Sequence, residues 1–170
     1  MLNCNKATLA CLGFLGATVL GLPSSPASAA TTASASTTFT VSATVQATCL
    51  ITANPLAFGT YTGLAANATT TIAVTCTNTT PYNVGLDAGL TSGATVSTRQ
   101  MKGPGTDVLN YGLYQDSTHA TNWGSTVGTD TETGTGNGSA QSLTVYGQVP
   151  ANQYVTPGSY SDTITATVTY

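Results

Sequence analysis

Apolar and polar residues alternate near the end of the chain, in the segment SYSDTITATVTY. Tyr160, Ile164, Ala166, Val168 and Tyr170 share one parity, and threonines occupy most of the positions between them. Because successive side chains of a strand point to opposite faces, this pattern predicts a half-buried β-strand. No turn or proline follows it in the sequence, so we expect its edge to need a covering partner.

Similar β-rich segments recur along the chain and are separated by turn signals such as Gly-Pro-Gly and Pro-Gly. They span residues 38–52, 54–63, 69–78, 81–89, 108–116 and 142–150. No stretch has the 3.6-residue period of a long amphipathic helix, so the predicted fold class is an all-β sandwich. Residues 124–141 show no apolar period, which predicts a long hairpin loop.

A second alternating segment lies close to the N-terminus. Residues 38–45 place Phe39, Val41, Ala43 and Val45 on one face, with threonines and a serine on the other. The preceding residues, 30–37, are small and polar, which predicts a flexible leader. On pattern alone, the simplest interpretation is that this segment pairs within its own sandwich.

Residues 1–29 have the layout of a secretory signal peptide. A short polar start with one lysine precedes an uncharged apolar run, and Ala27 and Ala29 form an A-x-A pattern. We expect cleavage after Ala29. A membrane anchor is the competing interpretation, but a run of sixteen residues that includes three glycines is short for a span.

Cleavage would leave two of the four cysteines, Cys49 and Cys76. In an exported chain, two cysteines most simply form one disulfide. The loop closed would contain 28 residues, counted from 49 to 76, and should stabilise the fold by about 3 to 4 kcal/mol on a chain-entropy estimate. A zinc site would need more ligands than a chain with one histidine offers.

Charge is sparse in this chain. After cleavage 170 − 29 = 141 residues would remain, one domain's length, with Arg99 and Lys102 against six carboxylates, or 2 − 6 = −4. No basic patch is present for nucleic acid or an anionic membrane. Such a composition is unusual for a freely soluble protein and suits an extracellular assembly.

Few side chains offer catalytic or metal-binding chemistry. Asp116 and His119 are three apart, but no serine lies in a G-x-S-x-G context, so His119 is expected in a solvated loop. Asp130 and Glu132 lack the D-x-D-x-D-G spacing of an EF-hand loop. We therefore expect no enzyme, metal site or cofactor.

Aromatic residues offer one further candidate surface. Trp123 could stack on a sugar, although packing in the core or a loop is the favoured interpretation. Tyr111, Tyr114 and Tyr146 lie in strand-like segments and are expected in the core or at its rim.

A series of short motifs extends over nearly the whole chain after residue 48. They are Cys49; Pro55-Leu56-Ala57-Phe58-Gly59-x-Tyr61; Ile72-x-Val74-x-Cys76; Pro81-Tyr82-x-Val84-x-Leu86-x-x-Gly89; Arg99-x-Met101; Leu109-x-Tyr111-x-Leu113-Tyr114-x-Asp116; Trp123-Gly124; Val145-Tyr146-Gly147-x-Val149-Pro150; Gly158-x-Tyr160-x-Asp162-Thr163; and Val168-Thr169-Tyr170. In order and number these motifs resemble the spore coat protein U domain, which is shared with the major subunits of Csu-type (archaic) chaperone–usher pili.

The resemblance implies an immunoglobulin-like sandwich of the pilin type, over residues 47–170, that lacks its last strand. Residues 30–46 would form an N-terminal extension that donates a strand to another chain, and Cys49–Cys76 would pin the first strand to the second. The candidate donor side chains are Phe39, Val41, Ala43 and Val45, and the candidate acceptor edge and chaperone contact are Ile164, Ala166, Val168 and Tyr170.

The same resemblance implies a structural subunit of a surface pilus (fimbria), exported through the periplasm and serving adhesion and biofilm formation. Its expected partners are a periplasmic chaperone, an outer-membrane usher, and identical or related subunits joined head to tail. A secreted spore or cyst coat protein of the same fold is the alternative. A two-domain tip adhesin would need a second domain, for which we expect no room.

Overall fold

A computed structural model describes residues 31–170, and within that range it contains strands and no helix. The predicted signal peptide, residues 1–29, lies outside the described residues. Residues 31–42 and the segment Ala43–Tyr170 belong to separate units. In the first, no residue belongs to a strand and every side chain is exposed. The second contains all the strands described below.

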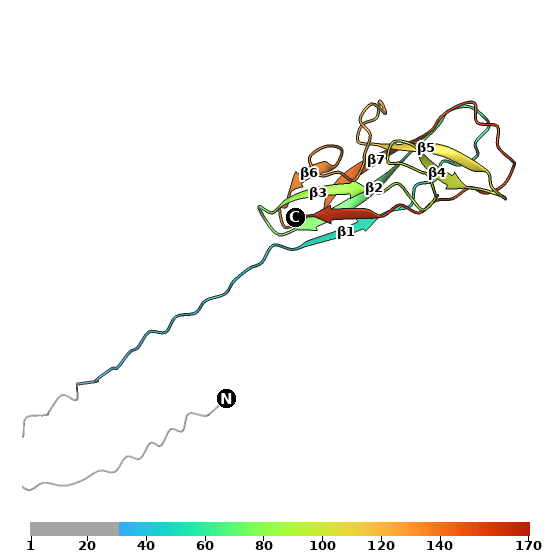
Figure 1. Ribbon diagram of the computed structural model, residues 1–170. Helices are drawn as coiled ribbons and strands as arrows, with labels where there is room; N and C mark the ends of the chain where they lie inside the picture. Colours follow the sequence, from blue (N-terminus) through green and yellow to red (C-terminus); the bar gives the residue numbers. More distant parts are fainter. Residues whose placement is uncertain (1–30) are drawn as a thin grey trace, which may run out of the picture. The chain divides into compact units, whose positions relative to one another are not determined.

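The strands form two antiparallel sheets, one with the order β1-β2-β7-β5-β4 and one with the order β6-β3-β8 (Figure 1). Their bounds are β1 Cys49–Ala53, β2 Ala66–Cys76, β3 Pro81–Leu86, β4 Arg99–Lys102, β5 Val108–Tyr114, β6 Glu132–Thr135, β7 Gln141–Val149 and β8 Ala166–Thr169. Threonine, valine, isoleucine and tyrosine are frequent in these segments, as suits a pleated surface.

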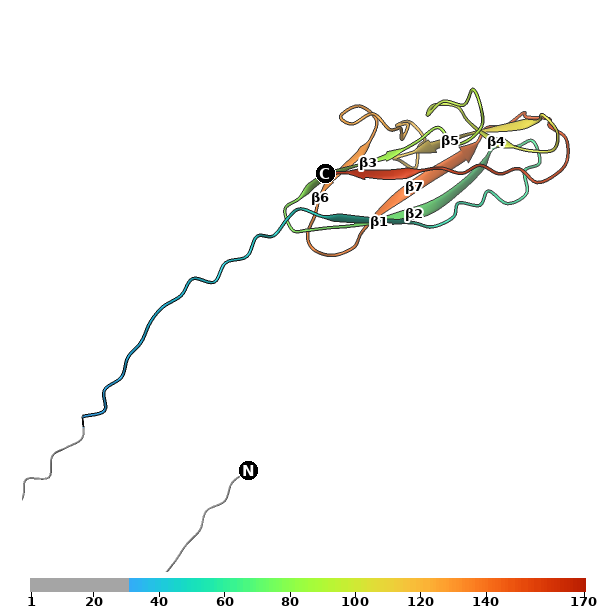
Figure 2. The same cartoon turned by 60° about the horizontal axis from the view of Figure 1, so that its bottom comes forward.

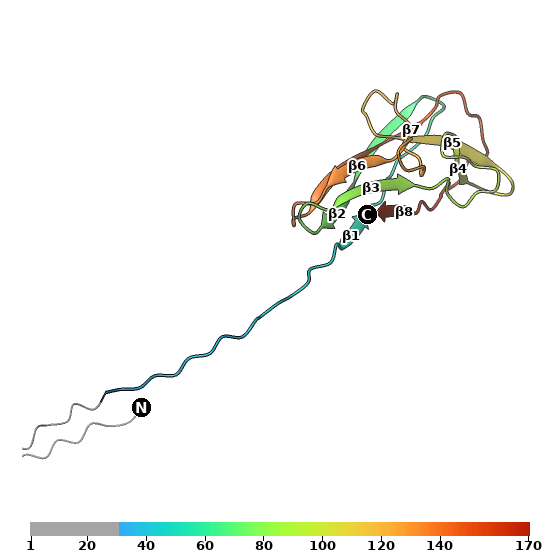
Figure 3. The same cartoon turned by 60° about the vertical axis from the view of Figure 1, so that its left-hand side comes forward.

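The core lies between the two sheets, whose layers are visible in Figure 3. Alternate residues of each strand point inward, so that Val74 of β2 and Val149 of β7 meet Val84 of β3 without any solvent exposure. Trp123 is also in this core, and its indole Nε1 donates a hydrogen bond of 2.8 Å to the Val84 carbonyl. The predicted all-β sandwich is therefore confirmed.

Two short strands were absent from the prediction. β4 lies at one edge of the larger sheet, and β6 lies inside the 124–141 segment that was predicted to be a loop. β6 pairs with β3 from Pro81↔Thr135 to Val84↔Glu132. Its sequence, ETGT, has no apolar face from which a strand could be predicted. Tyr82 packs against β6 and occupies the space that a side chain at Gly134 would need.

Two of the predicted strands are shorter than their sequence patterns suggested, and a third is absent. Of residues 38–52, only β1 is a strand, and residues 54–63 form none. The C-terminal segment changes partners, since Ser161 bridges to Lys102 of β4 whereas β8 pairs with β3. An alternating pattern needs a neighbouring strand to become a ladder, and the described chain supplies one only over these shorter lengths.

Candidate strand-acceptor site

A slot lies between one edge of each sheet. Within the described chain β1 pairs only with β2, and β8 pairs only with β3. β1 and β8 contact one another across the space between the sheets and run in opposite directions (Figures 1 and 2). Each strand therefore has one edge of unpaired backbone N–H and C=O groups beside the slot, which is the arrangement that accepts a further strand.

The slot opens into an apolar cavity of about 400 Å³. One wall is formed by the end of β1 and the residues after it, including Leu56 and Phe58, and the other by Ile164 and Ala166. Its floor consists of buried core residues: Ile72, Leu86, Tyr111, Leu113 and Val145. The sandwich core thus reaches the surface here, and an apolar side chain placed in the cavity would leave water.

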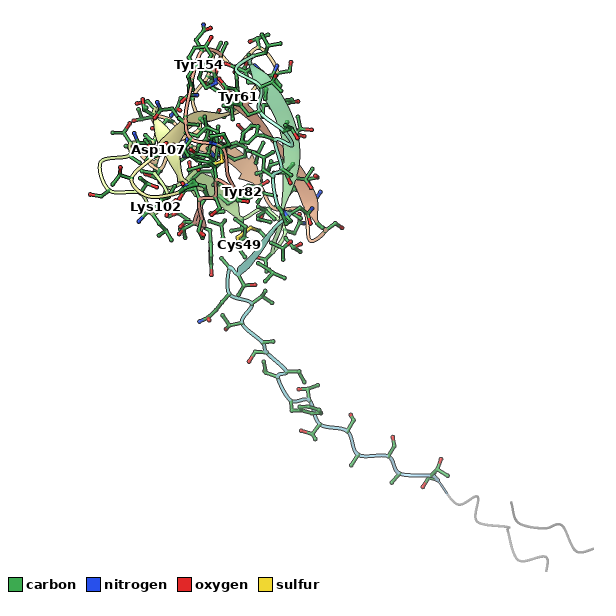
Figure 4. The ribbon with its side chains drawn as sticks, turned by 90° about the vertical axis from the view of Figure 1, so that its right-hand side faces the viewer. Cys49, Tyr61, Tyr82, Lys102, Asp107 and Tyr154 are labelled. Atoms are coloured by element: carbon green, nitrogen blue, oxygen red, sulfur yellow. A yellow bond between two sulfur atoms is a disulfide. The ribbon has the colours of Figure 1, made fainter. Side chains whose placement is uncertain are left out.

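A second cavity, of about 860 Å³, continues from the first and shares Leu56, Phe58, Met101 and Tyr160 with it. It lies between two irregular segments, 56–63 and 153–160. Tyr61 and Tyr154 lie at the end of the domain opposite Cys49 (Figure 4). The slot therefore extends beyond the short strands β1 and β8 toward that end.

The side chains of the C-terminal segment alternate as predicted. Ile164, Ala166 and Val168 are partly buried and pack against the core, whereas the threonines between them are exposed. Ile164 and Ala166 line the first cavity. Tyr170, at the end of the segment, is 58 % exposed. Three of the four predicted acceptor residues thus lie along one wall of the domain.

The cysteine pair joins the slot wall to the sheet behind it. Cys49 and Cys76 are directly opposite one another in the β1–β2 ladder and form a disulfide, with their Cα atoms 4.1 Å apart. β1 has only five residues and a partner strand on one side. The covalent link therefore reinforces an edge strand that has hydrogen bonds to one neighbouring strand only.

Two carboxylates hold the chain that leads into β8. Asp162 accepts hydrogen bonds from the Leu90 amide at 2.9 Å and the Tyr111 hydroxyl at 2.7 Å. Asp87 accepts from the amides of Thr165 and Gly89. Burial, together with the bond to Asp162, raises the pKa of Tyr111 far above its usual range, so Tyr111 remains a donor.

The pKa of Asp87 is lowered in the folded protein. Partial burial acts to raise it, but the hydrogen bonds from Thr165 and Gly89 and the positive charge of Arg99 outweigh that effect. Asp87 is therefore ionised at neutral pH and keeps its acceptor role toward the segment before β8.

Arg99, whose role was not evident from the sequence, is fully buried. Its guanidinium donates to four backbone carbonyl oxygens: those of Asp87 at 2.8 Å, Val96 at 2.6 Å, Leu86 at 3.0 Å and Trp123 at 2.6 Å. Burial lowers the pKa of Arg99, but a guanidinium keeps its proton in proteins. Arg99 thus connects the end of β3, at the slot floor, to two loops.

The predicted donor residues line neither of these two cavities. Phe39, Val41 and Val45 are each more than 80 % exposed, and Ala43 is exposed as well. Large apolar side chains in this state are costly to hydrate, and a strand partner would bury one face of them.

The other candidate residues take structural positions. His119 packs edge-on against Tyr114 in a loop, with ring centroids 5.2 Å apart. The carboxylate of Asp130 accepts from the Thr126 amide within its own loop. Residues 31–170 contain no group of three histidine, cysteine or acidic side chains that could hold a metal ion. In the same range no helix is long and apolar enough to cross a membrane.

The sequence prediction named only one wall of the slot. The opposite wall includes Leu56 and Phe58, which belong to a motif noted in the sequence but were not assigned to the site. Their spacing of two residues beside Pro55 was the available signal, because it places both side chains on one face of an extended segment. The role of Asp162 carried no such local signal.

Comparison with known proteins bears on this geometry. Residues 35–167 match the Spore Coat Protein U domain. Protein U of Myxococcus xanthus is 37 % identical over 128 residues, which are 68 % of this chain and 71 % of that protein. A crystal structure of the CsuC–CsuE chaperone–tip adhesion subunit pre-assembly complex, from the archaic chaperone–usher Csu pili of Acinetobacter baumannii, is similar in fold, with a TM-score of 0.56 and 24 % identity. The match covers 75 % of this chain and 41 % of that one, and it confirms the immunoglobulin-like pilin fold.

Proposed function

Since this chain belongs to the Spore Coat Protein U domain family, we propose that it is a structural subunit of a surface pilus, assembled through donor-strand exchange. A neighbouring copy supplies the strand that fills the slot, and repetition of this head-to-tail contact builds a fibre. The subunit is exported through the periplasm, and the fibre serves adhesion and biofilm formation at the cell surface.

The observation that carries this proposal is the slot between β1 and β8, whose two flanking strands lack charges. The other two sheet edges carry exposed or partly exposed charges, with Lys102 on β4 and Glu132 on β6. β1 and β8 have no charged residue. Charged side chains on edge strands discourage pairing with other chains, so this distribution leaves open only the edges that border the apolar cavity.

The donor in this proposal is the alternating segment of the extension. In a strand, successive residues of one parity are about 6.6 to 6.8 Å apart, so Phe39, Val41, Ala43 and Val45 would form a row on one face. That row has the form needed to enter the slot beside Ile164, Ala166 and Val168. Main-chain hydrogen bonds to β1 and β8 would supply affinity, and the apolar row would supply specificity.

The similarity to a pilus subunit solved in complex with its chaperone supports the proposed partners. Before assembly the slot needs a temporary strand from a periplasmic chaperone, and an outer-membrane usher then directs its replacement by the next subunit. Tyr170, which follows β8 and is 58 % exposed, would contact the chaperone.

The alternative is a secreted coat protein of a spore or cyst, built by the same strand exchange. The description of the matching family, a spore coat domain, favours it. Electron microscopy of the producing cell separates the two functions, since pili extend from the surface whereas a coat forms a continuous layer around it.

The donor-strand proposal is tested with two charge substitutions at adjacent positions. Val41→Glu places a carboxylate on the donor face, and Thr40→Glu places the same charge on the opposite face. We expect wild-type and Thr40→Glu chains to form oligomers that resist SDS and separate on heating, and Val41→Glu chains to remain bound to the chaperone as monomers. Normal oligomers from Val41→Glu would overturn the assignment.

A further inference from the structure

We propose that the outer face of the larger sheet, the face turned away from the core, carries a binding site for a neutral linear polysaccharide. This inference goes beyond the pilus function proposed above and does not depend on strand exchange, since none of its residues lines either cavity. The site, which we call the tyrosine patch, consists of six residues from β2, β5, β7 and the loop after β5: Asn67, Thr69, Tyr114, His119, Tyr146 and Gln148.

The strand registers place five of these residues in two adjoining rows, on three strands that lie side by side (Figure 1). In one row Thr69 of β2 is opposite Tyr146 of β7, which is opposite Tyr114 of β5. In the next row Asn67 is opposite Gln148. Neighbouring strands are about 4.8 Å apart, and alternate residues of one strand are about 6.8 Å apart, so these side chains form one continuous surface.

Both tyrosines of the patch face outward. Val145 of β7 and Leu113 of β5 belong to the core, so the residue after each of them points to the opposite face of the sheet. Those residues, Tyr146 and Tyr114, are partly exposed. The ring of Tyr114 occupies the space that a side chain at Gly112 would need, so it lies along the surface of the sheet.

The loop after β5 adds His119 to this surface. Its ring packs edge-on against Tyr114 with centroids 5.2 Å apart, and its Nδ1 lies 3.5 Å from Nε2 of Gln148. His119 has a φ of 57°, a left-handed conformation that is uncommon for a residue other than glycine. The Asp116 carboxylate holds the loop in this shape, because it accepts hydrogen bonds from three loop amides, the shortest at 2.7 Å from Thr121. The rim of the patch is therefore organised before a ligand binds.

The polar groups of the patch are oriented by one another and remain available to a ligand. Gln148 Nε2 donates a hydrogen bond of 3.0 Å to Asn67 Oδ1, which fixes both amide planes. The hydroxyls of Tyr61 and Tyr111 donate within the domain. Within residues 31–170, the two tyrosine hydroxyls of the patch make no such bond, so they can donate to and accept from a bound molecule.

The chemistry of the patch indicates the class of ligand. A pyranose ring has an apolar C–H face and hydroxyl groups around its edge, so it can stack on a tyrosine while amides and hydroxyls bind its edge. None of the six residues is acidic, lysine or arginine, so the patch offers no permanent charge to pair with an anionic polymer. Because the rows extend over three strands, an extended chain of sugars fits the patch.

The surroundings of the patch favour a polysaccharide over a protein partner. The adjoining row, in which Thr71 is opposite Thr144, is polar. The centre of a protein–protein interface is usually more apolar than this. In the proposed fibre every subunit would repeat the patch, so that individually weak sites would act together through avidity.

Depletion from solution by insoluble polysaccharides tests the site. The purified chain is mixed with suspended cellulose or chitin, both neutral and linear, and the protein left in the supernatant is measured against a sample without polysaccharide. We expect wild type to bind at least one of them and the corresponding hexasaccharide, cellohexaose or chitohexaose, to compete. Tyr146→Ala should bind about tenfold more weakly, because the ring on which the sugar stacks is gone. Tyr154→Ala is the matched control, since it removes a tyrosine that is 88 % exposed outside the patch.

Two further variants separate a lost contact from a damaged fold. Tyr146→Phe keeps the ring and should bind within about twofold of wild type. Gln148→Leu keeps most of the side-chain volume but removes the amide, and it should weaken binding by about two- to tenfold.

Several results would overturn the proposal. One is a wild-type chain that neither cellulose nor chitin depletes. Another is an equal loss of binding in Tyr146→Ala and Tyr154→Ala, which would indicate unspecific adsorption. Binding that high salt abolishes would also contradict it, because the patch has no permanent charge to be screened. If Tyr146→Ala forms no SDS-resistant oligomers and wild type binds neither polysaccharide, the face is instead an interface between subunits.

Discussion

Arg99 offers a direct test of how this sandwich is held together, through the substitution Arg99→Met. Methionine can fill much of the apolar stem's volume, but it cannot donate to the four carbonyl oxygens that the guanidinium contacts. The carbonyls of Leu86 and Trp123 are in fully buried contacts. Each buried acceptor left without a donor costs about 1 to 3 kcal/mol, so we expect a loss of about 2 to 6 kcal/mol in the free energy of unfolding.

A competing argument predicts only a small loss in the free energy of unfolding for the same substitution. Buried ion pairs can often be replaced by apolar residues at little cost, because both charges leave together. In this protein the acceptors are backbone carbonyls, which no side-chain substitution removes. The two arguments therefore predict different results for the same variant.

The assay is guanidinium chloride unfolding of the purified chain, followed through the fluorescence of Trp123, the single tryptophan. Lys102→Met is the matched control, because it removes the same charge from an exposed position on the same strand. Arg99→Lys should fall between wild type and Arg99→Met, since an ammonium keeps the charge but cannot reach all four carbonyls. The reasoning is refuted if Arg99→Met unfolds within about 0.5 kcal/mol of Lys102→Met.

Three further predictions concern the elements around the slot. Replacing both Cys49 and Cys76 with serine should lower the free energy of unfolding by about 3 to 4 kcal/mol, measured in the same assay, because the 28-residue loop is then open in the unfolded chain; an unchanged value would contradict the entropic account. Gly89→Ala should cost more than Gly93→Ala, since both have positive φ but only a Cβ at Gly89 would meet the Asp162 carboxylate; equal losses would show that the contact relaxes freely. Because the pKa of Asp87 is lowered on folding, its stabilisation is fully present above its unfolded pKa of about 3.9 and is lost as the pH falls through the folded value. Unfolding midpoints of wild type and Asp87→Asn between pH 6 and 2 should therefore converge below about pH 4, and parallel curves would contradict this role.

Much of the sandwich follows from local patterning. β2, β3, β5 and β7 lie within or close to their predicted segments, because each carries an apolar face of period two that must turn toward a core. The disulfide also followed from the sequence, since the predicted signal cleavage leaves two cysteines, which have one simple pairing. The alternation of Ile164, Ala166 and Val168 could be predicted for the same reason as the strands, since these residues also form an apolar face of period two.

The slot depended on the fold. β1 and β8 are more than a hundred residues apart in sequence, and each has an ordinary strand pattern that does not reveal which edge lacks a partner. β6 and Arg99 had no local signal, since ETGT has no apolar face and a lone arginine looks like a surface residue until four carbonyls surround it. The alternating pattern of a segment decides which face of its strand each side chain occupies. Only the packing of distant segments decides which backbone groups and which buried charges find partners, because those contacts form between parts of the chain that carry no information about each other locally.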